Sequence, residues 1–226
     1  MISFPFGGGA WYNRVRNFPC WRNGLHMNSK FFDIKKEKQD RIINAALKIF
    51  AMQGYRHGST DDIVKEAAIS KGLLFHYFGS KVGLYCFIYD YSSRFMTLEL
   101  RSTVNARETD LFALMKQIEC AKMHAMKAYP YMQQFLNRSL SEDSYEALLS
   151  TEEKRNALSE AYAAIDSQID YAALPGGVDG ERLRKMLDFT IKGLMTERFQ
   201  DASFQPEMLY EEICGYLDMV RGIVYR

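Results

Sequence analysis

Hydrophobic residues recur with the period of an α-helix along most of this chain. The first clear case is residues 35–55, where apolar positions three and four residues apart form one broad stripe and basic side chains occupy the other face. Gly54 follows this pattern, and glycine commonly ends helices because it tolerates the left-handed conformation. We therefore predict a helix over these residues whose apolar stripe is buried: Ile42, Ile43, Ala46, Leu47, Ile49 and Phe50.

The helical period continues beyond residue 80 with few interruptions. No segment shows the apolar–polar alternation that is typical of strands, and the polar residues 141–150 predict a turn or loop. The sequence therefore predicts an all-α fold of about nine helices. Besides the N-terminal ones, these helices are expected over 80–103, 109–128, 131–140, 151–173, 179–199 and 206–224, with a clear break at Leu-Pro-Gly-Gly, 174–177.

Residues 60–81 carry the signals of two short helices joined by a tight turn. Thr60 is a suitable N-cap, Ser70 caps a second helix that Gly79 ends, and Ser80 caps the next helix. Two short helices with a compact turn form the helix-turn-helix arrangement, whose second helix enters the major groove of DNA. That second helix presents donors suited to phosphates or base edges: Lys71, His76 and Tyr77.

This segment resembles the DNA-binding domain of the tetracycline-repressor (TetR) family of bacterial regulators. The resemblance covers residues 42–81 and is most specific in SKGLLFHYFGSK at 70–81. It implies a three-helix DNA-binding domain at 35–82 and a helical effector-binding and dimerisation domain at 83–226, and the different composition of the N-terminal residues predicts a leader or arm at 1–34. The matching residues are Ala45, Ala46, Phe50, Gly54, Tyr55, Thr60, Ile63, Ala67, Ala68, Ser70, Lys71, Gly72, Phe75, His76, Tyr77, Phe78, Ser80 and Lys81.

The resemblance also implies which side chains contact DNA. Phosphate contacts hold the protein in register, whereas groove-facing residues read the bases. Taken alone, Tyr77 and Lys81 also fit an ordinary solvated helix face, and Phe75 and Phe78 are expected to complete the core of the domain. The implied phosphate contacts are Thr60, Tyr77 and Lys81, and the implied groove-facing residues are Lys71, Gly72, Leu73 and His76.

Composition and motifs narrow the class of function. The formal net charge is only +1, so attraction to DNA must come from a local basic patch. Cys20, Cys86, Cys120 and Cys214 are far apart and lack metal-binding spacing, which favours reduced thiols. No nucleotide-binding or hydrolase motif is present, and His124 lacks the acid three residues earlier that di-metal bundles use. The sequence predicts no enzyme, no cofactor, no metal site and no membrane span.

The second predicted domain is rich in methionine and aromatic residues. Such side chains can line an adaptable ligand pocket, but they equally fit the core of a helical bundle. An effector that binds better to a DNA-incompetent conformation would shift the population away from DNA. The pocket candidates are Tyr91, Phe95, Phe112, Met115, Met123, Met126, Phe135, Tyr162 and Phe189.

The last two predicted helices are apolar around more than one face. Gly193 and Gly215 would permit close approach of a second helix pair. The resemblance implies a homodimer that binds a two-fold operator, and a purely intramolecular core is the alternative. The dimer-interface candidates are Met186, Leu194, Leu209, Ile213, Tyr216, Leu217 and Val220.

Residues 1–29 differ from the rest because they show no sustained period and contain no acidic residue. They fit a disordered or non-native leader, with Met27 as the true start, or a basic arm in which Arg14, Arg16 and Arg22 contact DNA. They lack the apolar core and the cleavage site of a secretory signal.

These observations predict a cytoplasmic, homodimeric transcriptional regulator that binds double-stranded DNA. The resemblance implies a repressor that a small, partly apolar ligand releases from a palindromic operator. The first alternative is an architectural or protein-interaction factor that binds DNA but has no ligand pocket. The second alternative, a helical-bundle enzyme, requires clustered carboxylates that the sequence does not offer.

Overall fold

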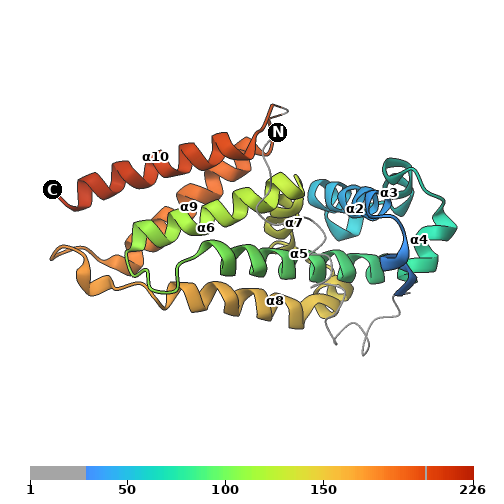
Figure 1. Ribbon diagram of the computed structural model, residues 1–226, viewed down its shortest axis with the longest axis horizontal. Coiled ribbons are helices and arrows are strands. Elements are labelled where there is room, and N and C mark those ends of the chain that lie inside the picture. Colours follow the sequence, from blue (N-terminus) through green and yellow to red (C-terminus); the bar gives the residue numbers. More distant parts are fainter. Residues whose placement is uncertain (1–28, 202) are drawn as a thin grey trace.

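The computed structural model describes residues 29–201 and 203–226 of the 226-residue chain. The expectations for Arg14, Arg16, Arg22, Cys20 and Met27 lie outside these described residues. Within them the regular structure is entirely helical, which confirms the predicted all-α class (Figure 1). The three helices α2 (Lys36–His57), α3 (Thr60–Ala67) and α4 (Lys71–Phe78) lie together at one end of an elongated molecule.

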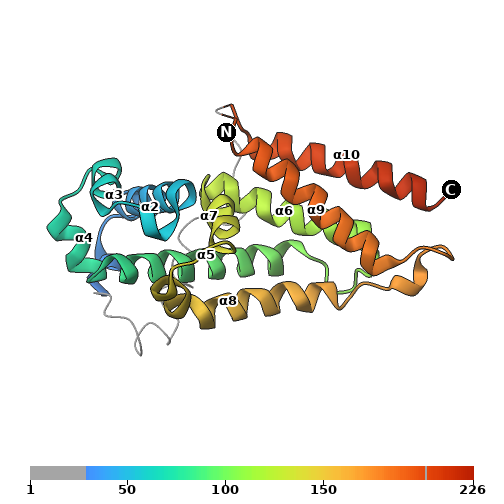
Figure 2. The ribbon, with the colours of Figure 1, turned by 180° about the vertical axis from the view of Figure 1, so that it is seen from behind.

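Helix α5 (Lys81–Thr103) runs from this end into the larger helical bundle. It contacts α2 and α4 near its start and packs along α6 (Leu111–Ala128) and α8 (Tyr145–Asp166). Side chains on nearly all its faces are buried, because other helices surround it. Helix α7 (Met132–Ser139) packs against α2, and α10 (Pro206–Val224) lies along α6 beside α9 (Gly180–Arg198), as Figures 1 and 2 show.

An aromatic cluster joins the start of α5 to the small N-terminal bundle. The short 3-10 helix η2 (Ser29–Asp33) places Phe31 in the core, with its ring centroid 5.0 Å from that of Phe78 and 5.2 Å from that of Phe87. Sequence analysis assigned these residues to the leader, yet Phe31 is fully buried. The core of this bundle therefore begins before α2.

The expectation that Phe75 completes this core is wrong. Helix α4 turns its buried face inward at Leu74, Tyr77 and Phe78, which are three and four residues apart, and Phe75 stays only half-buried beside that face. Leu74, at 1% exposure, occupies the inward position instead.

Two other boundaries differ from the sequence pattern. Gly54 adopts φ of +70°, which kinks α2, but helical turns continue to His57. Helix α8 starts at Tyr145 within the predicted loop, because Ala147 and Thr151 are buried on its inner face. It ends at Asp166, and the 3-10 helix η3 (Tyr171–Ala173) follows, because the amide of Asp170 donates to the carbonyl of Thr109 and turns the chain.

The start of α5 packs so closely on α4 that residue 83 has no room for a side chain. A Cβ atom at Gly83 would lie 2.1 Å from the carbonyl oxygen of Phe78. The close approach fixes the angle at which α4 leaves the long helix.

Gly83→Ala is expected to destabilise the protein by about 1–3 kcal/mol, although alanine is the better helix former, because the added methyl group forces the backbones apart. Urea denaturation measures this change. Gly72→Ala is the matched control, since a Cβ atom at Gly72 meets nothing within 4 Å. Equal stability of the two variants would show that the close approach does not constrain the fold.

Candidate nucleic-acid interface

The helix-turn-helix is built by local capping interactions. Ser59, rather than the expected Thr60, is the N-cap of α3, and its hydroxyl accepts a hydrogen bond from the amide of Asp61 at 3.1 Å. Ala68 adopts a left-handed conformation (φ 51°) at the end of α3 and begins the turn. Ser70 caps α4 by accepting from the amide of Leu73 at 3.2 Å, as predicted. Thr60, the first residue of α3, stays near the surface.

One face of α4 is open to solvent. Lys71, Gly72 and His76 are exposed, and Leu73 is half-buried beside them. Lys71 forms a surface ion pair with Asp61, with 2.8 Å between its Nζ and a carboxylate oxygen. Such exposed pairs contribute little to stability, so DNA phosphate can compete for the lysine at little cost. The four predicted groove-facing residues thus lie on one accessible surface.

The charge distribution favours the same end of the molecule. Residues 35–82 contain nine lysines and arginines against five aspartates and glutamates, whereas the whole chain carries a formal net charge of only +1. Most of this excess lies with α2, which has five lysines and arginines against two acidic residues. A local basic surface of this kind attracts the DNA backbone independently of sequence.

Tyr77 has a different environment from the solvated face considered above. Its side chain is only 6% exposed and packs edge-to-face against Phe31, with ring centroids 5.6 Å apart. The ring is therefore part of the aromatic core. Any phosphate contact is limited to the hydroxyl group, and removing the whole side chain would disturb folding as well as binding.

Lys81 is held by the protein itself. Its Nζ donates to the main-chain carbonyl of Arg56 at 3.1 Å and lies 4.8 Å from the centre of the Tyr55 ring. Burial lowers the pKa of the Lys81 ammonium, and the nearby Glu146 and Glu142 oppose that shift. The bond to Arg56 uses one of the three donors of the ammonium group, so Lys81 keeps donors for a phosphate while its position is set by the protein.

Three acidic residues at the α7–α8 junction, Glu142, Asp143 and Glu146, form what we call the acidic corner. Glu142 accepts from the amide of Tyr55 at 2.9 Å, and Glu146 accepts a short hydrogen bond from the Tyr55 hydroxyl. Burial, followed by the bond to Glu146, raises the pKa of Tyr55. Sequence reasoning missed this contact because its partners are about ninety positions apart, beyond the reach of any local signal.

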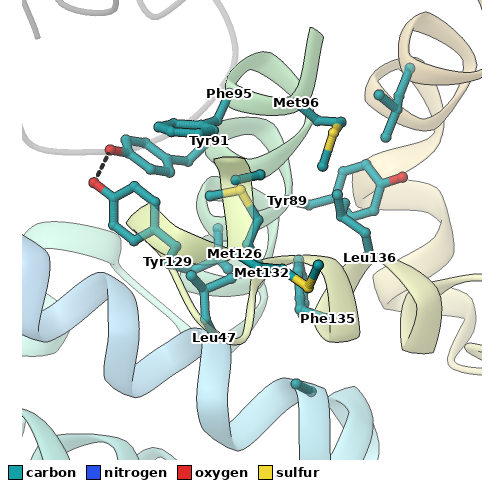
Figure 3. Packing of buried hydrophobic residues seen from close by; sticks show 14 of the residues in the cluster. Leu47, Tyr89, Tyr91, Phe95, Met96, Met126, Tyr129, Met132, Phe135 and Leu136 are labelled. Atoms are coloured by element: carbon teal, nitrogen blue, oxygen red, sulfur yellow. Dashed lines mark hydrogen bonds between the residues drawn. The ribbon is translucent and has the colours of Figure 1, made fainter. Parts of the chain in front are cut away.

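The predicted pocket residues do not form one pocket. Figure 3 shows Tyr91, Phe95, Met126 and Phe135 packed at the junction with Leu47 of α2, where they fill space between helices. Phe112 is also fully buried, Met123 is half-buried, and Phe189 is exposed. The helical periodicity of the sequence identified most of these apolar positions correctly. However, most of these side chains pack directly against neighbouring helices, which leaves no space for a ligand beside them.

A cavity of about 460 Å³ does exist, between the inner faces of α6, α7, α8 and α9 with Tyr89 of α5. Of the predicted pocket residues, only Met115 and Tyr162 line it. Most of its other lining residues are polar or charged, including Glu119, Lys122 and Arg155. The lining thus includes two of the predicted residues but is more polar than the methionine and aromatic set that the sequence suggested.

The predicted dimer residues separate into two groups. Leu209, Ile213 and Leu217 are each 1% exposed, because α10 packs them inside the chain. Met186 and Tyr216 are exposed, and Leu194 and Val220 are half-buried. The exposed members share the surface of α9 and α10 with other large apolar side chains: Phe189, Met208, Met219 and Ile223.

Within the described residues, no helix is both long and apolar enough to cross a membrane. In that same part of the chain, no group of three or more His, Cys, Asp or Glu side chains is arranged to hold a metal ion. Cys86, Cys120 and Cys214 are free thiols.

The N-terminal helices are similar in sequence to known bacterial regulators. The family model of bacterial regulatory proteins, tetR family, matches residues 42–85. An uncharacterised HTH-type transcriptional regulator of Bacillus subtilis (strain 168), YuxN, is 51% identical over 49 residues, which are 22% of this chain and 17% of YuxN. HbdR, an HTH-type transcriptional regulator of Aromatoleum sp. (strain CIB), is 44% identical over 46 residues, 20% of each chain. The chain thus spans about a fifth of the length of these curated relatives.

Solved structures share the fold over a much longer stretch. A TetR family transcriptional regulator from Chloroflexus aurantiacus J-10-FL matches 89% of this chain and 97% of its own, with a TM-score of 0.63 and 23% identity. PfmR from Thermus thermophilus, another TetR family regulator, matches 80% of this chain and 96% of its own, with a TM-score of 0.53 and 20% identity.

The exposed α4 face, the capped turn and the basic end of the molecule define a helix-turn-helix protein. Residues 42–85 match the TetR family model, and most of the chain shares the fold of solved TetR family regulators. The motif and the fold therefore agree with the predicted TetR resemblance.

Tyr55→Phe is expected to reduce the free energy of unfolding by about 1 kcal/mol, because it removes the hydroxyl bonded to Glu146 but keeps the buried ring. Urea denaturation measures the loss. Tyr145→Phe is the matched control, since the Tyr145 side chain is 78% exposed. Identical unfolding midpoints for both variants would contradict a stabilising role for the acidic corner.

Proposed function

We propose that the protein is a cytoplasmic, homodimeric transcriptional regulator, and specifically a repressor that leaves a two-fold operator when a small ligand occupies its second domain. The observation that carries the DNA-binding part is the solvent-open face of α4, with Lys71, Gly72 and His76 on the basic end of the molecule. Because Gly72 has open space around it, the helix can approach base edges closely.

Dimerisation is supported by the apolar surface of α9 and α10. In α10, Met208, Gly215, Met219, Gly222 and Ile223 recur at helical spacing and are exposed. A Cβ atom at Gly215 or Gly222 would meet nothing within this chain, which leaves room for a neighbouring helix. Apolar patches of this extent commonly mark protein interfaces. Two copies joined here would present two α4 helices to half-sites about 34–36 Å apart.

Ligand control is supported by how the cavity connects to the DNA-binding helices. Gln133, Leu136, Asn137 and Leu140 of the α7 region line the cavity, and the acidic corner follows within a few residues. That corner holds Tyr55, and Tyr55 lies beside Lys81. A ligand that repositions α7 would therefore act on the interface side of α2 and α5, shifting the population between two conformations. The cavity also favours a sensor over an architectural factor without a pocket.

His76→Glu is expected to weaken binding to DNA from upstream of the protein's own gene at least about tenfold, because it places negative charge beside phosphates. Fluorescence anisotropy at two salt concentrations measures the affinity. Arg107→Glu is the charge-reversal control, because Arg107 is exposed between α5 and α6, at the opposite end of α5. An equal loss in both variants would indicate a general charge effect and contradict reading by α4.

In the same assay, Tyr77→Phe isolates the tyrosine hydroxyl without removing the buried ring. A phosphate contact predicts a loss of up to about tenfold in affinity, with an unchanged unfolding midpoint. Unchanged affinity would exclude the hydroxyl as a phosphate contact.

Met219→Glu is expected to convert the dimer to monomers, raising its dissociation constant by about 100-fold or more, because it buries a charge in an apolar interface. Sedimentation velocity measures the change. Met52→Glu is the control, since Met52 is 61% exposed, compared with 55% for Met219, and belongs to α2, which packs against α3, α5 and α7. A Met219→Glu protein that remains dimeric would place the interface elsewhere.

A further inference from the structure

The cavity between α6, α7, α8 and α9 has a charged lining that shows what kind of ligand it can hold. Its walls carry four cations and three carboxylates, together with amide and phenol groups, and its volume is about 460 Å³. Pockets of this size hold compact molecules. The charged groups are Lys122, Arg155, Arg184, Lys192, Glu119, Asp166 and Asp188.

Glu119 and Lys122 form a buried ion pair in one wall. One oxygen of Glu119 accepts from Lys122 Nζ at 2.6 Å, and the two side chains are 5% and 16% exposed. Burial would lower the pKa of Lys122, but Glu119, together with Tyr162 and Asp188, outweighs burial and the pKa is raised. The lysine is therefore held by the carboxylate beside it in this wall.

The second carboxylate oxygen of Glu119, Oε2, is buried and has no hydrogen-bond partner among the described residues. A buried ionised oxygen without a donor is costly, and native proteins rarely leave one unsatisfied. Gln133 of α7 lines the same cavity and is 5% exposed. Its Nε2 donates to Asn137, whereas its Oε1 is likewise unpartnered within the described part of the chain. Both oxygens lie just beneath the cavity wall and have almost no exposed surface. A ligand ammonium group would reach them once the two side chains rotate toward the cavity, and its donors would then satisfy both oxygens.

Some of the cationic side chains in the cavity have carboxylate partners and others have none. Arg184 pairs with Asp166 at 3.0 Å and also with Asp188. Arg155 instead donates to the main-chain carbonyl of Ser139 at 2.8 Å. Within the described part of the chain, neither Arg155 nor Lys192 has a carboxylate partner. Two positive charges therefore remain for an anionic group, and guanidinium suits a carboxylate because its planar donors match both oxygens.

We propose that this cavity binds a zwitterionic amino compound, a free amino acid or a dipeptide. Its carboxylate faces Arg155, with Lys192 at the exposed rim, and its ammonium group donates to Glu119 Oε2 and Gln133. Met115, Leu136 and Leu158 supply apolar surface for the remainder of the molecule. This assignment names the effector class for the ligand-sensing role proposed above and rests on that role for its regulatory meaning, but binding itself does not require DNA.

Isothermal titration of the full-length protein without DNA tests the proposal with the twenty standard L-amino acids and a set of alanyl dipeptides. At least one is expected to bind. The best binder is then compared with its decarboxylated amine and its deaminated acid, each expected to bind at least about tenfold more weakly, because each leaves one charged group of the protein unpaired. Decanoate serves as the apolar anion.

Two variants assign the groups by a crossed comparison. Glu119→Gln is expected to lower the affinity for the amino compound about tenfold or more and to leave the affinity for its deaminated acid unchanged. Arg155→Gln is expected to lower the affinity for the amino compound and for the deaminated acid, and to leave the affinity for the decarboxylated amine unchanged. Glu152→Gln and Arg107→Gln are matched controls at exposed positions. A structural effect of either cavity variant would instead lower the affinity for every probe equally.

The proposal is overturned if no amino acid or dipeptide binds at about 10 mM, a concentration at which even weak ligands register. It is also overturned if decanoate or a monofunctional analogue binds as tightly as the amino compound. DNA release is measured separately with the operator complex. An amino compound that binds but does not release DNA would leave the site assignment intact and refute ligand-controlled repression, so the two failures are distinguishable.

Discussion

The structure depends on the burial of α5 by both halves of the molecule. Phe87 packs with the rings of the N-terminal bundle, whereas Tyr85, two residues earlier, packs against Phe50 of α2 and Phe135 of α7. Close-packed side chains transmit displacement because interiors contain few voids to absorb it. Rotation of α5 within the larger bundle must therefore move α4, which is held against it by the close approach at Gly83.

Hydrogen bonds also fix how the two helical bundles are oriented relative to each other. The acidic corner bonds to both the main chain and the hydroxyl of Tyr55, and Tyr129 bonds to Tyr91 at 2.5 Å and to Asp40 of α2 at 3.1 Å. Hydrogen bonds require specific distances and angles, whereas apolar contacts tolerate sliding. The two helical bundles are thus fixed relative to each other by contacts at the α6–α7 and α7–α8 turns, which flank one of the helices that line the cavity.

The same arrangement links the chemistry of the cavity to the DNA-binding surface. Gln133 and Asn137 share α7 with Phe135, which packs toward α2 and α5. The proposed ligand would satisfy Glu119 and Gln133 and so change the energetics of α7, which contacts both bundles. Lys81, now bonded to the carbonyl of Arg56, lies where such a change would alter its availability to phosphate.

The sequence by itself determined the helix-turn-helix, the all-α class and most helix positions. Helix caps such as Ser70 and the 3.6-residue apolar period depend only on residues close together in the sequence. They can therefore be recognised without knowing which other helices pack against them. Only the tertiary structure decided which apolar residues face inward: Leu217 is buried against the chain's own helices, whereas Met219 is exposed. It also brought Glu119, Gln133 and Arg155 around one cavity, because burial and charge pairing are properties of helices meeting in space, and residues far apart in sequence carry no local sign of that meeting.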